Sequence, residues 1–241
     1  MADRRIAAVE DHIDFPDLTG IVNRVDGRGL IAIPDLIDNH VHITGGGGEG
    51  GFATRTPELE IGDLVRAGVT GVIGVRGTDG FSRSMENLVA KAKAIRDRGF
   101  SCWILTGSYQ VPVRTLTDRI ESDIMLIREI IGVGEIAIAD HRSSHPPVPE
   151  LVSLVSAARI GGMLAGKSGV VNFHLGAGEA GFDILETALR PVTETPAKIF
   201  HLNGKGRIEA GYDADLVLLD TDLAIRRVMA RGRFFDPEAD G

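Results

Sequence analysis

Two histidines separated by one residue are the sharpest chemical signal in the sequence. They lie in the run Asp38-Asn39-His40-Val41-His42, at the end of a short apolar stretch. If that stretch is a strand, alternate side chains share a face, so both imidazoles point the same way. Two imidazole nitrogens on one face can hold a single Zn²⁺ ion. The alternative is a solvent-facing strand end with two incidental histidines, because motifs this short often match by chance.

Two further residues extend this candidate ligand set. Glu135 is predicted to begin an otherwise apolar strand, Glu135–Ala139, and His174 ends another, Gly169–His174. Burying a carboxylate costs free energy unless it is paired or bound to a metal. Taken singly, Glu135 also fits a surface glutamate at a strand start, and His174 also fits a packed core histidine. Together with the two histidines they predict a metal site.

A glycine-rich run, Gly45–Gly51, directly follows the histidine strand and carries Glu49. Glycines let the backbone, including that of Gly47, approach a ligand closely, and Glu49 offers a carboxylate to an ammonium group. A flexible linker is the alternative, but it would be out of place at this position. Thr78 lies in the predicted turn Gly77–Gly80, after the second strand. We therefore interpret Gly47, Glu49 and Thr78 as candidate substrate contacts.

Tyr109 and Arg142 follow the third and fourth predicted strands. The Tyr109 phenol can hydrogen-bond a developing oxyanion, and the Arg142 guanidinium can bind a carboxylate through two parallel hydrogen bonds. The alternatives are a half-buried tyrosine and a salt bridge between Arg142 and Asp140. Three other histidines have no companions in this pattern and are interpreted as surface or packing residues: His12, His145 and His201.

Strands and helices alternate along the centre of the chain. The predicted strands are Leu36–Ile43, Val69–Val75, Ser101–Leu105, Glu135–Ala139 and Gly169–His174. The predicted helices begin after an N-cap at Thr56, at Ser84, near Ile120 and at Pro149-Glu150, the third continuing through Ile130. Such alternation predicts parallel strands with right-handed crossovers, an α/β fold. Because the candidate residues follow several successive strands, a (β/α)₈ barrel is favoured over a doubly wound sheet.

The two ends of the chain are β-rich. The segment up to Ile33 and the predicted strands Gly206–Ile208, Asp215–Leu219 and Ala224–Ala230 indicate a small β-sandwich built from both termini, with one helical stretch at Ile184–Leu189 before it. The predicted domains are therefore 1–34 and 204–241 for the small β domain and 35–203 for the barrel.

Composition excludes several classes of protein. The 241 residues carry Lys+Arg 26 against Asp+Glu 34, a net charge of −8, which argues against binding to nucleic acid or to an anionic membrane. A single cysteine, Cys102, excludes a disulfide framework and a cysteine-rich zinc module. The sequence contains no signal-peptide pattern and no apolar run long enough to span a bilayer. These features predict a cytoplasmic protein.

These motifs, in this order, resemble the amidohydrolase superfamily and, within it, the isoaspartyl (β-aspartyl) dipeptidases. The matching segments are 38–42, 45–51, 54–59, 77–80, 105–109, 140–143, 161–167, 188–193, 204–208 and 211–216. The resemblance implies a zinc hydrolase with two zinc ions in a TIM barrel and a terminal β-sandwich, acting by attack of a metal-bridged hydroxide on a β-aspartyl dipeptide. By resemblance, His40 and His42 hold one metal, Glu135 bridges both and His174 holds the second. Glu49 binds the α-amino group, Tyr109 polarises the scissile carbonyl and Arg142 binds the α-carboxylate.

The sequence departs from the family in three ways: at Glu135, at Asp35, which stands where a glycine is usual, and in strands six to eight. Glu135 stands where a carboxylated lysine is common, and Glu bridges occur elsewhere in the superfamily. The chain also passes, near 181–186, from the fifth βα unit directly to the family's C-terminal helix, so strands six to eight have no counterpart. We expect an incomplete barrel, either internally deleted, incompletely represented or completed by another chain, since five strands cannot close one.

The departures leave three hypotheses about function. The leading one is an isoaspartyl dipeptidase-like metallohydrolase, which tested alone is expected to turn over substrate poorly. The others are a non-catalytic remnant that binds metal or ligand, and another amidohydrolase activity such as a deacetylase or cyclic-amide hydrolase. Open sheet edges favour association, so we expect a homo-oligomer.

Overall fold

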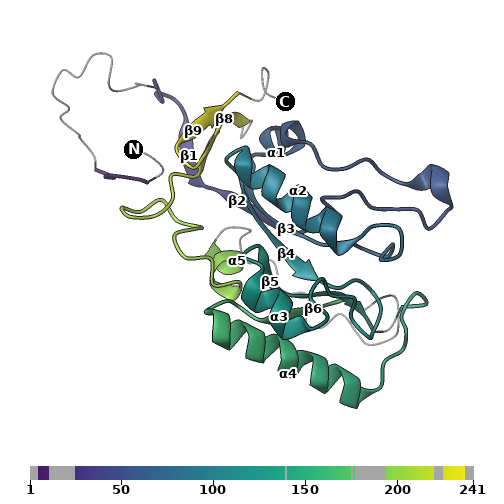
Figure 1. Ribbon diagram of the computed structural model, residues 1–241. Coiled ribbons are helices and arrows are strands. Elements are labelled where there is room, and N and C mark those ends of the chain that lie inside the picture. Colours follow the sequence, from purple (N-terminus) through teal and green to yellow (C-terminus); the bar gives the residue numbers. More distant parts are fainter. Residues whose placement is uncertain are drawn as a thin grey trace.

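The computed structural model describes residues 5–10, 25–138, 140–174, 176, 194–219 and 225–236 (Figure 1). Its strands are β1 Ile31–Pro34, β2 Leu36–Val41, β3 Val69–Gly74, β4 Ser101–Thr106, β5 Ile130–Ala137, β6 Val170–His174, β7 Leu216–Leu219, β8 Ile225–Ala230 and β9 Arg233–Phe235. Its helices are α1 Ile61–Ala67, α2 Met85–Asp97, α3 Ile120–Leu126, α4 Val148–Ala165 and α5 Glu194–Ile199, with a 3₁₀ turn η1 at Phe52–Thr54. His12, the stretch Ile184–Leu189 and the junction near 181–186 lie outside the described residues.

Five parallel strands form the central sheet in the order β2-β3-β4-β5-β6. Each neighbour follows the last in sequence, and the helices between them act as crossovers, so every strand ends at the same edge. The order and direction of these strands fit part of a (β/α) barrel, as the alternating pattern predicted. In the part of the chain that the structure describes, β6 pairs only with β5.

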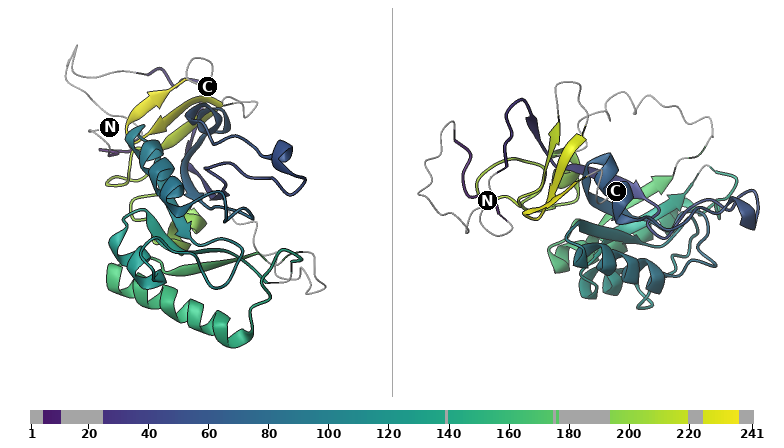
Figure 2. Two further views of the ribbon diagram at one scale, coloured as in Figure 1. Left: turned by 45° about the vertical axis from the view of Figure 1, so that its right-hand side comes forward. Right: turned by 90° about the horizontal axis from the view of Figure 1, so that it is seen from above.

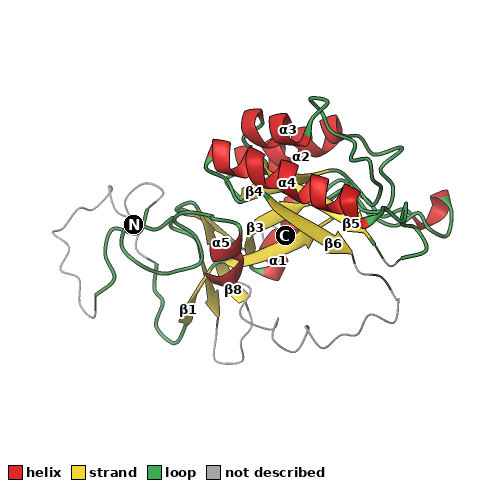
Figure 3. Cartoon of the chain, turned by 90° about the horizontal axis from the view of Figure 1, so that it is seen from below, coloured by secondary structure: helices red, strands yellow, loops and turns green. Residues whose placement is uncertain are grey.

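The sheet is apolar on both faces, as parallel sheets must be when they are covered twice. One face packs against α2, α3 and α4, which Figure 3 shows gathered on the same side. Side chains that alternate with these, including Ile37, Ile73 and Leu105, form a second cluster with Phe200, which follows α5. These two clusters hold the strand ends, and therefore the candidate site, in place.

The small sheet has the order β1-β7-β8-β9 and is antiparallel throughout. Figure 2 shows it at the opposite end of the parallel sheet from α4. Its Phe235 ring packs on Phe100 with centroids 4.9 Å apart, which joins the two sheets. Both termini contribute strands, as expected, but Gly206–Ile208 forms no strand. The predicted boundaries at 34 and 204 stay a prediction.

The prediction that Glu135 begins a strand is wrong, because β5 starts at Ile130 and Glu135 is its sixth residue. Ile127 and Ile130 continue the helical spacing of Ile120 and Ile124, yet α3 ends at Leu126 and Ile127 is extended. The Lys167 ammonium donates to the carbonyls of Ile124, Ile127 and Ile130, so the chain turns at once from helix into strand. An apolar spacing alone does not separate a helix from the buried strand that follows it.

The first helix also begins later than predicted. Glu60 is the N-cap of α1 and forms a capping box with Asp63, so the helix starts at Ile61 rather than after Thr56. Thr56 is used by the glycine-rich run instead: its hydroxyl accepts from Gly46 N at 2.7 Å, and its own N donates to Gly46 O at 3.0 Å. The Ser84 cap is as predicted, and α1 ends at Gly68, which has a left-handed backbone. No described helix is long and apolar enough to cross a membrane.

Candidate active site

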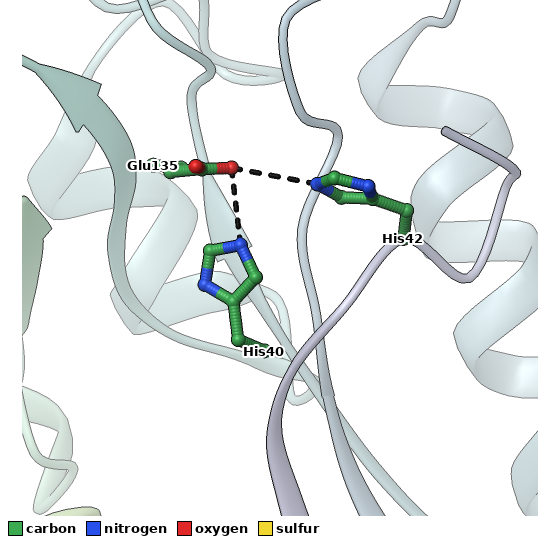
Figure 4. Close-up of side chains that lie close together, drawn as sticks. All are labelled: His40, His42 and Glu135. Atoms are coloured by element: carbon green, nitrogen blue, oxygen red, sulfur yellow. Dashed lines mark hydrogen bonds and ion pairs between the residues drawn. The ribbon is translucent and has the colours of Figure 1, made fainter. Parts of the chain in front are cut away.

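Three potential metal ligands meet above the C-terminal edge of the parallel sheet (Figure 4). His40 is in β2, His42 follows it, and Glu135 comes from β5. The Nε2 atoms of His40 and His42 lie 3.2 Å and 3.5 Å from Glu135 Oε2. Figure 4 shows both imidazoles directed at that one oxygen. Because Glu135 lies near the end of β5 rather than at its start, its carboxylate reaches the same edge as the histidines.

The other oxygen of Glu135 faces His174, the last residue of β6. His174 Nδ1 lies 2.7 Å from Glu135 Oε1, and its Nε2 lies 3.1 Å from Asp140 Oδ2. Glu135 is 2% exposed, so its two oxygens are each directed at imidazoles rather than at water. A second carboxylate behind a histidine fixes the ring orientation and tautomer, as is usual around metal ligands.

The electrostatics of this cluster favour an ionised Glu135. Burial acts to raise the pKa of Glu135, but hydrogen bonds from His40 and His42 outweigh it and hold the pKa well below its usual range. The same contact raises the pKa of His40. An anionic carboxylate between imidazoles is the state that a cation requires.

The remaining predicted site residues surround this cluster. The Arg142 guanidinium donates to Glu49 Oε1 at 3.0 Å and to Thr78 Oγ1 at 3.1 Å, and it forks onto both oxygens of Asp140 at 2.8 Å. Tyr109 Oη lies 3.3 Å from His174 Nδ1. The loops after β2, β3, β4 and β5 therefore bring opposite charges and a phenol beside the histidine–glutamate cluster.

A hollow of about 370 Å³ opens next to these groups and is lined by Gly47, Glu49 and Thr78 together with Phe52 and Phe81. The structure thus brings all of the predicted site residues to one edge of the sheet. His145 and His201 are exposed, and neither belongs to the cluster of potential metal ligands. A larger hollow of about 510 Å³ lies between Val111–Val113 and α4 and is lined by none of the predicted site residues.

Sequence reasoning missed three contributors to the site. Asp140 was weighed only as a salt-bridge partner of Arg142, but it also contacts His174. Gly46 and Gly77 enclose the His42 ring: a Cβ on Gly46 would lie 2.5 Å from Nδ1, and one on Gly77 would lie 2.8 Å from Nε2. A glycine in each of two loops signals a close backbone approach, but only the fold shows that both approach one ring.

Comparison with solved structures identifies the family. The chain is 34% identical to the β-aspartyl dipeptidase of the thermophile Fervidobacterium islandicum AW-1, with a TM-score of 0.84 over 97% of this chain and 90% of that chain. A second structure of that enzyme, in complex with the dipeptide β-Asp-Leu, is 36% identical with a TM-score of 0.79 over 87% and 85% of the two chains. The chain belongs to the amidohydrolase family.

The family model for amidohydrolases matches residues 156–232, which include the second half of α4, β6, α5 and the strands β7 and β8 of the small sheet. An N-acetylglucosamine-6-phosphate deacetylase from Pasteurella multocida shares the fold, at 12% identity and a TM-score of 0.51 over 98% of this chain and 94% of that chain. The protein is an isoaspartyl dipeptidase-like amidohydrolase, as its sequence motifs indicated, and its class of chemistry is hydrolysis.

Proposed function

We propose that this protein is a zinc-dependent hydrolase that cleaves the β-aspartyl linkage of small dipeptides. The observation that carries the proposal is that Arg142 and Glu49 lie side by side next to a His-His-Glu cluster. A β-aspartyl dipeptide has an ammonium and a carboxylate on one carbon, and its scissile amide is a short distance away. The β-Asp-Leu complex of the Fervidobacterium enzyme supports this substrate class.

The donor set suits zinc. Tetrahedral Zn²⁺ with bonds of about 2.0–2.1 Å requires ligand atoms about 3.3 Å apart. The two histidine–glutamate separations, 3.2 Å and 3.5 Å, bracket that value. Because the second oxygen of Glu135 faces His174, we propose that Glu135 is shared by two ions and that His174 binds the second.

Each remaining residue has a role in this proposal that follows from its chemistry. Bound zinc would lower the pKa of the attacking water and withdraw electron density from the scissile carbonyl. Arg142 would hold the α-carboxylate and Glu49 the α-ammonium group, with Thr78 and the Gly47 backbone beside them. Burial raises the pKa of Tyr109 to about 12, so its phenol stays protonated and can donate to the carbonyl oxygen as negative charge develops.

Zinc content and hydrolysis together test the proposal. Elemental analysis of zinc-loaded protein should find two zinc ions per chain, fewer in His42→Asn, and an unchanged content in the control His145→Asn, whose side chain is exposed. Wild-type protein should cleave β-Asp-Leu, slowly when the chain is assayed alone, and leave α-Asp-Leu intact. Folded protein that takes up no zinc, or that cleaves both peptides equally, would contradict the proposal.

A second candidate function is binding of metal or of a dipeptide without turnover. It is favoured by one observation, that the described parallel sheet ends at β6. One zinc or none per chain, with β-Asp-Leu bound but not cleaved, would support it. Sedimentation of the same samples tests our further proposal that the protein is a homo-oligomer, since open sheet edges favour association.

A further inference from the structure

A buried arginine lies beneath the glycine-rich run that carries Glu49. Arg83 directly precedes Ser84, the N-cap of α2, and is 4% exposed. Its guanidinium donates to Thr44 O at 3.1 Å, to Gly46 O at 2.9 Å and to Gly47 O at 3.5 Å. All three nitrogens of the Arg83 guanidinium therefore donate to backbone carbonyls. None of these three hydrogen bonds is to a side chain that we propose to bind substrate.

These carbonyls belong to a segment with little conformational preference of its own. Gly45, Gly47, Gly48 and Gly51 all have positive φ, between 65° and 104°. Glycine backbone of this kind samples many conformations unless other groups restrain it. The planar guanidinium fork supplies that restraint, because it satisfies carbonyls that have to be paired when they are buried.

A neighbouring contact ties the same segment to the loop after β3. Arg55 pairs with Gly47 in an isolated β-bridge and donates to Asp79 Oδ2 at 3.1 Å and to Ser82 Oγ at 2.7 Å. Arg83 Nη1 lies 3.6 Å from the same Asp79 oxygen. The backbone of the glycine-rich run is thus held by side-chain hydrogen bonds from Arg83 and by the β-bridge to Arg55.

We propose that Arg83 is a positioning residue for substrate selection. By holding the carbonyls of Thr44, Gly46 and Gly47, it fixes the backbone from which Glu49 meets Arg142, and so it sets how strongly the site prefers a free α-ammonium group. The inference rests on the proposed function and adds a residue to it that contacts no substrate.

The chain offers a matched control in a second buried arginine. Arg76 is 2% exposed and donates to Gly107 O at 2.7 Å and to the carbonyls of Arg83 and Arg114 at 3.3 Å. It has the same chemistry and burial as Arg83, but its shortest hydrogen bond holds the loop that carries Tyr109, and its contact with Arg83 is to the backbone carbonyl and not to the guanidinium. Loss of either guanidinium group should destabilise the fold to a similar extent, whereas only the substitution of Arg83 should affect recognition of the amine.

The test compares calorimetric binding of β-Asp-Leu and N-acetyl-β-Asp-Leu to zinc-loaded protein. Wild-type protein should prefer the free amine, and Glu49→Gln should reduce that preference about 10-fold or more, the range for a charged hydrogen bond. Arg83→Lys should reduce the preference for the free amine by a comparable factor. The double variant Glu49→Gln/Arg83→Lys should show little further reduction. Arg76→Lys should keep the wild-type preference. Asp79→Asn is a milder change at a half-buried residue and should reduce the amine preference by a smaller factor. This variant replaces Arg83→Lys in the test if Arg83→Lys does not fold.

Hydrogen exchange and zinc content separate the possible failures. Amides of residues 45–51 should exchange faster in Arg83→Lys but not in Arg76→Lys, at unchanged zinc content. An unchanged amine preference in folded Arg83→Lys, or an equal loss in both arginine variants, would overturn the role of Arg83 alone. Wild-type protein that binds neither compound would overturn the proposed function, and with it this inference.

Discussion

Arg142 and Glu49 form an ion pair, with Nη1 3.0 Å from Oε1, although 93 residues separate them in the sequence. The groups proposed to bind a carboxylate and an ammonium thus neutralise each other in the absence of a ligand. The head group of an α-amino acid brings both opposite charges on one carbon, so it replaces this pair without leaving either charge unpartnered. The pair is partly exposed, which keeps the cost of opening it low.

Arg142→Lys should weaken binding of β-Asp-Leu about 10–100-fold, because a lysine cannot fork onto Asp140 and also reach Glu49 and Thr78. Thermal stability should change less than dipeptide affinity, since lysine keeps a positive charge beside Asp140 and Glu49. Calorimetric titration and thermal denaturation measure the two effects. Arg66→Lys, in an exposed pair with Asp63, is the control. Unchanged dipeptide affinity in Arg142→Lys would remove the carboxylate-binding role.

Gly46→Ala should lower zinc content while the protein stays folded. The new methyl group would lie 2.5 Å from His42 Nδ1, so the ring has to turn and its Nε2 moves away from Glu135. Elemental analysis and circular dichroism measure the two properties. Gly27→Ala is a suitable control, because nothing lies within 4 Å of its added Cβ. Equal zinc content in the two variants would mean that His42 tolerates the displacement.

Asp123→Ala should lower the free energy of unfolding by roughly 3 kcal/mol, because several buried donors lose their acceptor. Asp123 is fully buried and accepts from Thr106 Oγ1 at 2.5 Å, from Leu116 N and from both the backbone and the hydroxyl of Thr117. Denaturant titration measures the free energy of unfolding of this variant and of the control Asp97→Ala, whose side chain is exposed. A difference below about 1 kcal/mol would show that water or the loop compensates.

Cys102 should resist alkylation by iodoacetamide at pH 9 until the protein unfolds. Burial raises the pKa of this thiol to about 12, so the reactive thiolate forms only in the unfolded chain near pH 9. The folded state then binds the thiol proton more tightly than the unfolded state does. The contribution of Cys102 to the free energy of unfolding is therefore fully present below pH 9 and is lost as the pH rises from 9 towards 12. Cys102→Ala should remove that part of the pH dependence. Rapid labelling of native protein would contradict the prediction.

The sequence was sufficient to place the candidate residues at one edge of the sheet because of the strand period and the parallel topology. His40 and His42 share a face through the two-residue repeat of a strand, and parallel strands end at one edge, so residues after successive strands must converge. Glu135 shows where this reasoning failed, since it was assigned to a strand start that would lie at the far edge. The residues just before it are buried glycines and apolar residues, and such runs lack the periodicity that marks a boundary.

The sequence by itself determined the family, the alternation of parallel strands and helices, and the candidate residues at their ends, because local spacing and strand direction decide these features. Only the tertiary structure decided that Glu135 divides its oxygens between His42 and His174, and that Arg83 holds the backbone below Glu49. Those contacts depend on the paths of loops, and loop paths follow from buried hydrogen bonds between residues far apart in the chain. No local periodicity encodes such bonds, because each forms only after the sheet has brought its partners together.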